Sequence, residues 1–99
     1  MRIKLYKIMG VTPSGGHWFL KAKPMEGGLG GDWVDYTLYS KERIAEANAY
    51  STRTQAENAL TLFVVEHPTD VISAYGSRGL LHVDYPRLTM SVVEFTAEV

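Results

Sequence analysis

The sequence predicts an α+β fold in which one long helix packs on one face of an antiparallel sheet of about five to six strands. Three observations lead to this prediction. Residues 52–66 carry apolar side chains at helical spacing behind a capping sequence. The segments on either side alternate apolar and polar residues or are rich in aromatic and β-branched side chains, as strands are. The 99 residues suit one domain, residues 1–99, with a single core.

The first two predicted strands are residues 2–9 and 17–23. Apolar and basic side chains alternate in the first strand, and residues 10–16 between them hold the proline and glycines of a turn. The two strands are therefore expected to form a hairpin with a long loop. The alternation slips at residues 6–8, which indicates either a bulge or burial of both faces.

The next segment, residues 25–31, contains four glycines and predicts a mobile connection, because glycine loses the most backbone entropy when it is ordered. A third strand is expected over residues 33–39, which are rich in aromatic and β-branched side chains. Residues 44–50 are ambiguous, since their alanines favour a helix and their alternation favours a strand. We predict a strand there, because a helix begins directly afterwards.

The helix over residues 52–66 has two candidate starts. Thr52 with Gln55, or Thr54 with Glu57, makes a capping box in which a hydroxyl accepts from a free N–H group at the helix start. The apolar stripe of this helix comprises Ala56, Ala59, Leu60, Phe63 and Val64. His67-Pro68 is expected to end the helix, because proline disfavours helical geometry in the residue before it.

Three strands are predicted after the helix, over residues 71–75, 80–85 and 88–99. The first two form a hairpin around a turn, and Pro86 separates the second from the last strand. The apolar alternation of the last strand shifts by one residue partway along, so we expect a bulge near Val92 and Val93.

Composition and charge exclude several classes of function. The sequence holds no cysteine, which excludes disulfides, thiol catalysis and thiolate zinc sites and fits the cytoplasm. No apolar run approaches the ~20 residues of a membrane span and no signal peptide is recognisable, so we expect a cytoplasmic protein without membrane contact. Residues 1–25 carry five basic and no acidic side chains, whereas residues 26–99 carry five basic and 11 acidic ones, a net charge of −6. Such segregation can steer a partner, although two solvated sheet edges are the simpler interpretation.

Little in the sequence indicates catalysis. His82 and Asp84 share one face of a predicted strand, but two ligands do not make a closed zinc site. The glycines of residues 27–31 are followed neither by Gly-Lys-Ser/Thr nor by a helix, so they do not match a phosphate-binding loop. We therefore expect no metal, no cofactor and no enzymatic activity. A small enzyme of unknown reaction built around His82 and Asp84 stays a lesser alternative.

A basic and aromatic hairpin face gives a second alternative, a nucleic-acid-binding module. Lysines between aromatic rings on an exposed sheet can neutralise phosphates and stack on bases. The slightly acidic total charge of −1 argues against such a partner. The residues of this alternative are Lys4, Tyr6, Phe19, Lys21 and Lys23.

The favoured hypothesis is binding to a larger protein. A small sheet cannot bury all of its large aromatic rings, and exposed tryptophan and tyrosine side chains are common anchors of protein interfaces. Two apolar residues of the helix also fall outside its stripe, so a loop, a second copy in a homodimer, or a partner must cover them. The candidate residues are Trp33, Tyr36, Tyr39, Leu62 and Val65. We expect a protein that docks on and modulates a larger one, such as an accessory inhibitor from a phage or mobile element.

Overall fold

The computed structural model describes residues 1–66 and 71–98, and it confirms the α+β fold. Its strands are β1 (Arg2–Val11), β2 (His17–Met25), β3 (Trp33–Ser40), β4 (Val71–Gly76), β5 (Gly79–Asp84) and β6 (Thr89–Glu98). Its helices are α1 (Arg53–Glu66) and three short 3₁₀ turns, η1 (Gly28–Gly30), η2 (Lys41–Glu46) and η3 (Tyr85–Arg87). The predicted helix end at His67-Pro68 and the last predicted strand residue, Val99, lie outside the described residues.

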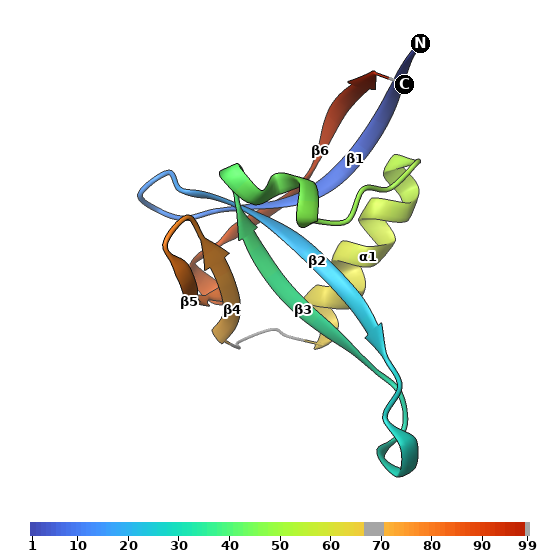
Figure 1. Ribbon diagram of the computed structural model, residues 1–99, viewed down its shortest axis with the longest axis vertical. Helices are drawn as coiled ribbons and strands as arrows, with labels where there is room; N and C mark the ends of the chain where they lie inside the picture. Colours follow the sequence, from blue (N-terminus) through green and yellow to red (C-terminus); the bar gives the residue numbers. More distant parts are fainter. Residues whose placement is uncertain (67–70, 99) are drawn as a thin grey trace.

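The strands form one sheet in the order β5-β4-β3-β2-β1-β6. All neighbours are antiparallel except β3 and β4, which run parallel over the pairs Leu38–Ala74 and Tyr39–Tyr75. A parallel pair needs a crossover connection, and η2 with α1 lies in that connection (Figure 1).

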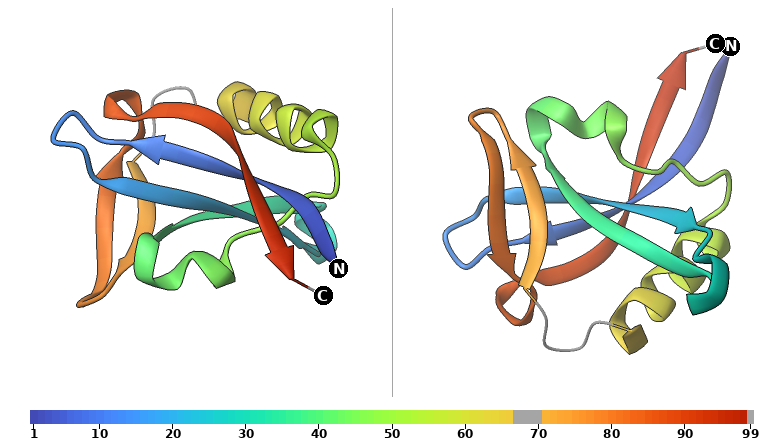
Figure 2. Two further views of the ribbon diagram at one scale, coloured as in Figure 1. Left: turned by 90° about the horizontal axis from the view of Figure 1, so that it is seen from above. Right: turned by 60° about the horizontal axis from the view of Figure 1, so that its bottom comes forward.

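The sheet opens into two arms because β1 and β2 pair only near their connecting turn. The hairpin predicted from the sequence is present, but its register covers only Met9–Val11 with His17–Phe19. The part of β1 before Met9 does not pair with β2 and runs alone with β6. After Phe19, β2 continues with β3 as far as Met25. Figures 1 and 2 show the two arms diverging, with both chain ends at the tip of the β1–β6 arm and α1 between the arms.

The gap between the diverging arms is filled by residues 47–50, and here the predicted strand over residues 44–50 is wrong. The chain forms η2 and then an extended stretch with a single bridge, in which Tyr6 and Tyr50 exchange main-chain hydrogen bonds of 2.9 and 2.8 Å. On the other side of the gap, Asn48 donates its N–H to the Leu20 carbonyl at 3.3 Å. The alternation of this segment therefore reflects an extended chain that lies between the diverging strands β1 and β2.

The core lies between the sheet and α1. Phe63 of the helix is fully buried, and the rings of Tyr36 and Tyr85 meet it edge-on at centroid distances of 5.0 and 4.8 Å. Thr52 accepts the Gln55 N–H at 3.2 Å, so the helix is capped at the first of its two candidate starts, while the Gln55 side chain accepts from the Ser51 hydroxyl at 2.9 Å. Most of the predicted stripe faces inward, but Val64 at its edge is 40% exposed.

The bulge predicted near Val92 and Val93 is absent, and of the two alternatives for residues 6–8 the structure shows burial of both faces. Strands β1 and β6 pair without interruption from Arg2–Glu98 to Val11–Thr89. The irregular pattern reflects burial on both faces: Ile8 is buried in the core, and the Lys7 ammonium on the opposite face donates to the carbonyls of Ile44 and Ala47 at 3.0 Å each. None of the described helices is both long enough and apolar enough to cross a membrane.

Candidate binding surface

Three of the five residues predicted to bind a protein are exposed: Trp33 lies where β3 begins, and Leu62 and Val65 lie near the end of α1. Trp33, the first residue of β3, is 52% exposed. Leu62 and Val65, in the last turns of α1, are 58% and 71% exposed. They lie three residues apart on the helix, which makes them neighbours on its surface.

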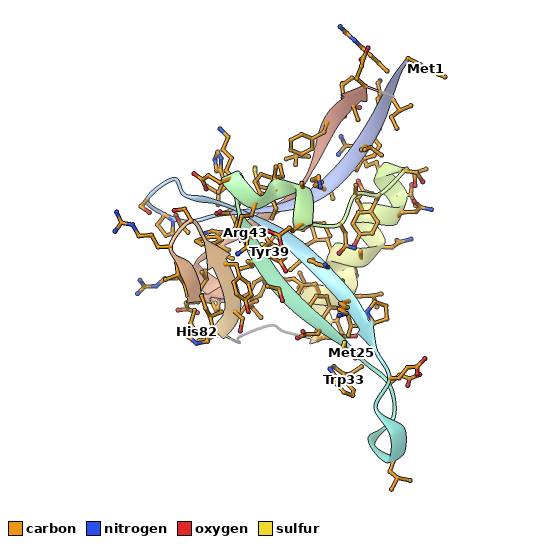
Figure 3. All side chains as sticks on the ribbon, in the orientation of Figure 1. Met1, Met25, Trp33, Tyr39, Arg43 and His82 are labelled. Carbon is orange, nitrogen blue, oxygen red and sulfur yellow. The ribbon has the colours of Figure 1, made fainter. Side chains whose placement is uncertain are left out.

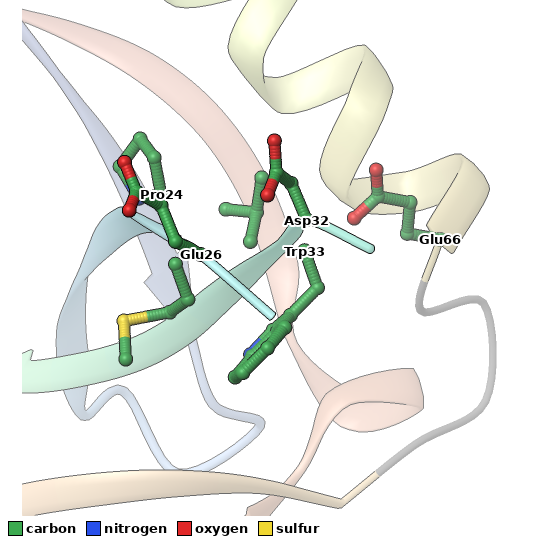
Figure 4. A pocket seen from close by; sticks show the side chains of 7 residues that line it. Pro24, Glu26, Asp32, Trp33 and Glu66 are labelled. Carbon is green, nitrogen blue, oxygen red and sulfur yellow. The ribbon is translucent and has the colours of Figure 1, made fainter. Parts of the chain in front are cut away.

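A pocket of about 690 Å³ joins these two elements. Trp33 forms one part of its wall, and Glu66, the last residue of α1, forms another. The lining is completed by Pro24, Met25, Glu26, Asp32 and Val34 from the end of the β2–β3 arm. Figure 4 shows the indole of Trp33 below the carboxyl groups of Glu26, Asp32 and Glu66.

Tyr36 has a different role from the predicted one. Its side chain is only 8% exposed and belongs to the core, so it is not part of an exposed surface. Burial, followed by a hydrogen bond to Glu66 and the negative charge of that carboxylate, raises the pKa of Tyr36 to about 12. Tyr36 therefore lies in the core next to Glu66, a residue of the pocket lining.

Leu62 lies on the helix next to Glu66, outside the pocket lining. It precedes Glu66 by four residues, so the two side chains are surface neighbours, and Val65 flanks Leu62 one turn on. Trp33 and Glu66, which line the pocket, together with Leu62 and Val65 on the helix beside Glu66, are called here the Trp33–α1 surface.

The glycine loop next to this surface is a tight turn. A Cβ atom at Gly27 would lie 1.7 Å from the Gly31 carbonyl oxygen and 2.7 Å from the Trp33 ring, so only glycine fits there. Gly31 has a φ of 77°, which also favours glycine. The loop thus closes on itself beside the indole of Trp33.

Tyr39 belongs to a separate cluster at the other end of β3. Its ring stacks on Tyr75 at 5.8 Å, and the Arg43 guanidinium lies 5.4 and 5.2 Å from the two ring centroids. Tyr39 lies six positions after Trp33, which is about 20 Å along a strand. Figure 3 shows Tyr39 beside Arg43 and Trp33 beside Met25, at opposite ends.

The residues of the nucleic-acid alternative do not form one face. Lys4 and Tyr6 pair with Thr96 and Glu94 of β6, and the Lys4 ammonium lies 3.8 Å from the Glu94 carboxylate. The remaining three residues, on β2, point to the opposite side of the sheet, because Trp18 shares a face with Gly10 and hence with Tyr6. Of these, Phe19 is buried against Phe95, Lys21 is half-buried and Lys23 is exposed.

The residues of the enzyme alternative are both exposed. His82 and Asp84 line a separate pocket of about 430 Å³ with residues of the β1–β2 turn, and the Asp84 carboxylate lies 3.8 Å from the Arg87 guanidinium. Across residues 1–66 and 71–98, no group of three or more His, Asp or Glu side chains is placed to hold a metal ion.

The sequence interpretation missed Glu26, Asp32 and Glu66 as members of the site. Asp32 and Glu26 flank the glycine loop directly before Trp33, a signal that was available. Glu66 becomes visible only when α1 is docked against β3.

No protein-family model, curated protein or solved structure matches this chain.

Proposed function

We propose that the protein is a small binding module that docks on a larger protein through the Trp33–α1 surface and modulates it. One observation carries the proposal: Trp33, 52% exposed, lines one pocket with Glu66 at the end of α1, and the exposed Leu62 and Val65 lie within four residues of Glu66 on that helix. Large apolar side chains gathered in one place on a small domain mark interaction sites. Exposed tryptophan is also the residue type most often found among the energetically dominant residues of interfaces.

The chemistry of the pocket favours a basic partner side chain. A lysine or arginine entering beside Trp33 would gain a cation–π contact with the indole and charge attraction to Glu26, Asp32 and Glu66. The net charge of −6 over residues 26–99 would also speed the approach of a positively charged surface. Inhibition by covering a functional surface of the partner is the simplest mode for a chain of 11.1 kDa.

Co-purification from the native host tests the proposal. Tagged wild-type protein is compared with Trp33→Ala and with Leu62→Lys plus Val65→Lys, and the captured proteins are identified by mass spectrometry. The matched control is Leu80→Lys plus Leu81→Lys, because these residues are adjacent and exposed at 55% and 49% but lie on β5.

We expect one protein to be retained by the wild type and the control and lost by both surface variants. Circular dichroism should show all four proteins folded, since the substituted side chains are exposed. Retention of the same proteins by every variant would refute the Trp33–α1 surface as the docking site, and recovery of nucleic acid instead of protein would refute protein binding.

A further inference from the structure

The far part of the β1–β6 arm, called here the terminal arm, consists of residues 2–7 paired with residues 93–98. One face of it is polar: Arg2 lies 3.5 Å from Glu98, and Glu94 accepts the Tyr6 hydroxyl at 3.2 Å. This face lies on the α1 side, since the Arg53 guanidinium is 5.2 Å from the centroid of the Tyr6 ring. The opposite face carries a row of partly exposed apolar side chains, Ile3, Leu5, Val93, Phe95 and Ala97.

The outer edge of β6 presents main-chain hydrogen-bonding groups. Tyr6 exchanges hydrogen bonds with Tyr50, so its N–H and C=O point away from β6. Directly opposite residues of an antiparallel ladder share this orientation, so the N–H and C=O of Glu94 point away from β1. The same holds for every second residue of β6, namely Met90, Val92, Thr96 and Glu98.

This edge lacks several of the features that usually prevent pairing. β6 has ten residues, contains no proline, lysine or arginine, and pairs with β1 without a bulge. At the other end of the sheet, β5 has six residues and leads directly into η3 with Pro86. Sheet edges in monomeric proteins are commonly kept short or blunted by proline, lysine or bulges.

We propose that β6 pairs with β6 of a second copy, antiparallel about a two-fold axis at Val93, so that the two sheets become one. In this register Met90 faces Thr96 and Val92 faces Glu94 of the second copy, which joins the outward N–H and C=O groups. Antiparallel pairing of a strand with itself is self-complementary, as a two-fold interface requires. The apolar rows of the two terminal arms then continue into one another on the face away from α1.

The charges of β6 favour a second copy as the occupant. Its only ionisable side chains are Glu94 and Glu98, and each has a basic partner on β1 of its own chain. In the Val93-centred register, residues 89–97 of one copy pair with the same residues of the second copy in the opposite direction. Glu94 then lies opposite Val92, so no like charges face each other. A register centred on Glu94 or on Thr96 would instead oppose Glu94 to Glu94 or to Glu98.

A single cysteine tests this arrangement, because the chain has none of its own. The Val93 pair across the axis does not exchange hydrogen bonds, and such pairs have Cα atoms about 4.5 Å apart, within the range of a disulfide. Val93→Cys should therefore oxidise to a covalent dimer on a non-reducing gel. Ala97→Cys, on the same strand and face, is the control and should stay monomeric under the same oxidation.

Sedimentation equilibrium provides the second readout. The wild type should be a dimer, and Val93→Lys, which sets two lysines opposite each other at the axis, should weaken it at least about tenfold. Ile3→Lys lies on the same apolar face but on β1 and should leave the dimer unchanged within about twofold. A monomeric wild type without a Val93→Cys cross-link would overturn the proposal. So would a dimer that Leu62→Lys plus Val65→Lys dissociates while Val93→Lys does not.

Discussion

At the scale of single residues, one side chain links the core to the candidate binding surface. Tyr36 packs against Phe63, and a hydrogen bond to the pocket residue Glu66 adds to the effect of burial on its pKa. The sequence indicated that Tyr36 was an aromatic residue in a strand, but it could not indicate which rings would be buried. The three most exposed of the candidate residues, Trp33, Leu62 and Val65, were predicted individually, whereas Glu66 was not, because its role depends on the docking of α1 against β3.

The raised pKa of Tyr36 predicts a loss of stability at high pH. The folded protein keeps this phenol protonated up to a pH of about 12, whereas an unfolded tyrosine ionises near 10. The unfolded state therefore binds fewer protons between these values, and the free energy of unfolding falls as pH rises through this window. Tyr36→Phe should show a shallower fall in urea midpoint between pH 9.5 and 11.5. Parallel curves for the two proteins would contradict the coupling of Tyr36 to burial and Glu66.

At the scale of secondary-structure elements, most of the fold could be predicted from the sequence. The hairpins, the helix and its cap follow from local patterns, because turn residues, capping residues and apolar periodicity act over a few positions. The prediction for residues 44–50 was wrong for a non-local reason: residues 47–50 fill a gap that exists because the part of β1 before Met9 does not pair with β2. The register of β1 with β2 places Lys4 and Tyr6 on the opposite face of the sheet from Phe19, Lys21 and Lys23, which removes the single face that the nucleic-acid alternative required.

The choice between the two capping boxes predicts the effect of one substitution. Thr52 accepts the Gln55 N–H, so Thr52→Ala should lower the free energy of unfolding by about 1 kcal/mol. Thr54→Ala is the matched control and should have a smaller effect, because Thr54 is exposed within the first turn of the helix. Denaturant midpoints of the two variants would test this prediction. A larger loss of stability for Thr54→Ala than for Thr52→Ala would contradict Thr52 as the capping residue.

At the scale of the whole molecule, the two arms and α1 present two separate surfaces. The Trp33–α1 surface lies where α1 meets the β2–β3 arm, and the β6 edge lies on the outer side of the β1–β6 arm. A second copy bound at β6 would therefore present two Trp33–α1 surfaces on one dimer. Such a dimer would bind a partner with two sites more tightly than either copy alone, provided that its geometry spans them.

The affinity of the purified protein for its co-purified partner tests the central claim most directly. Isothermal titration calorimetry would compare the wild type, Trp33→Ala and the β5 control, Leu80→Lys plus Leu81→Lys. If Trp33 is the main anchor of the interface, Trp33→Ala should raise Kd by about 30-fold, which corresponds to about 2 kcal/mol, and the control should change Kd by less than about twofold. An unchanged Kd for Trp33→Ala, or an equal loss in the control, would contradict docking through the Trp33–α1 surface.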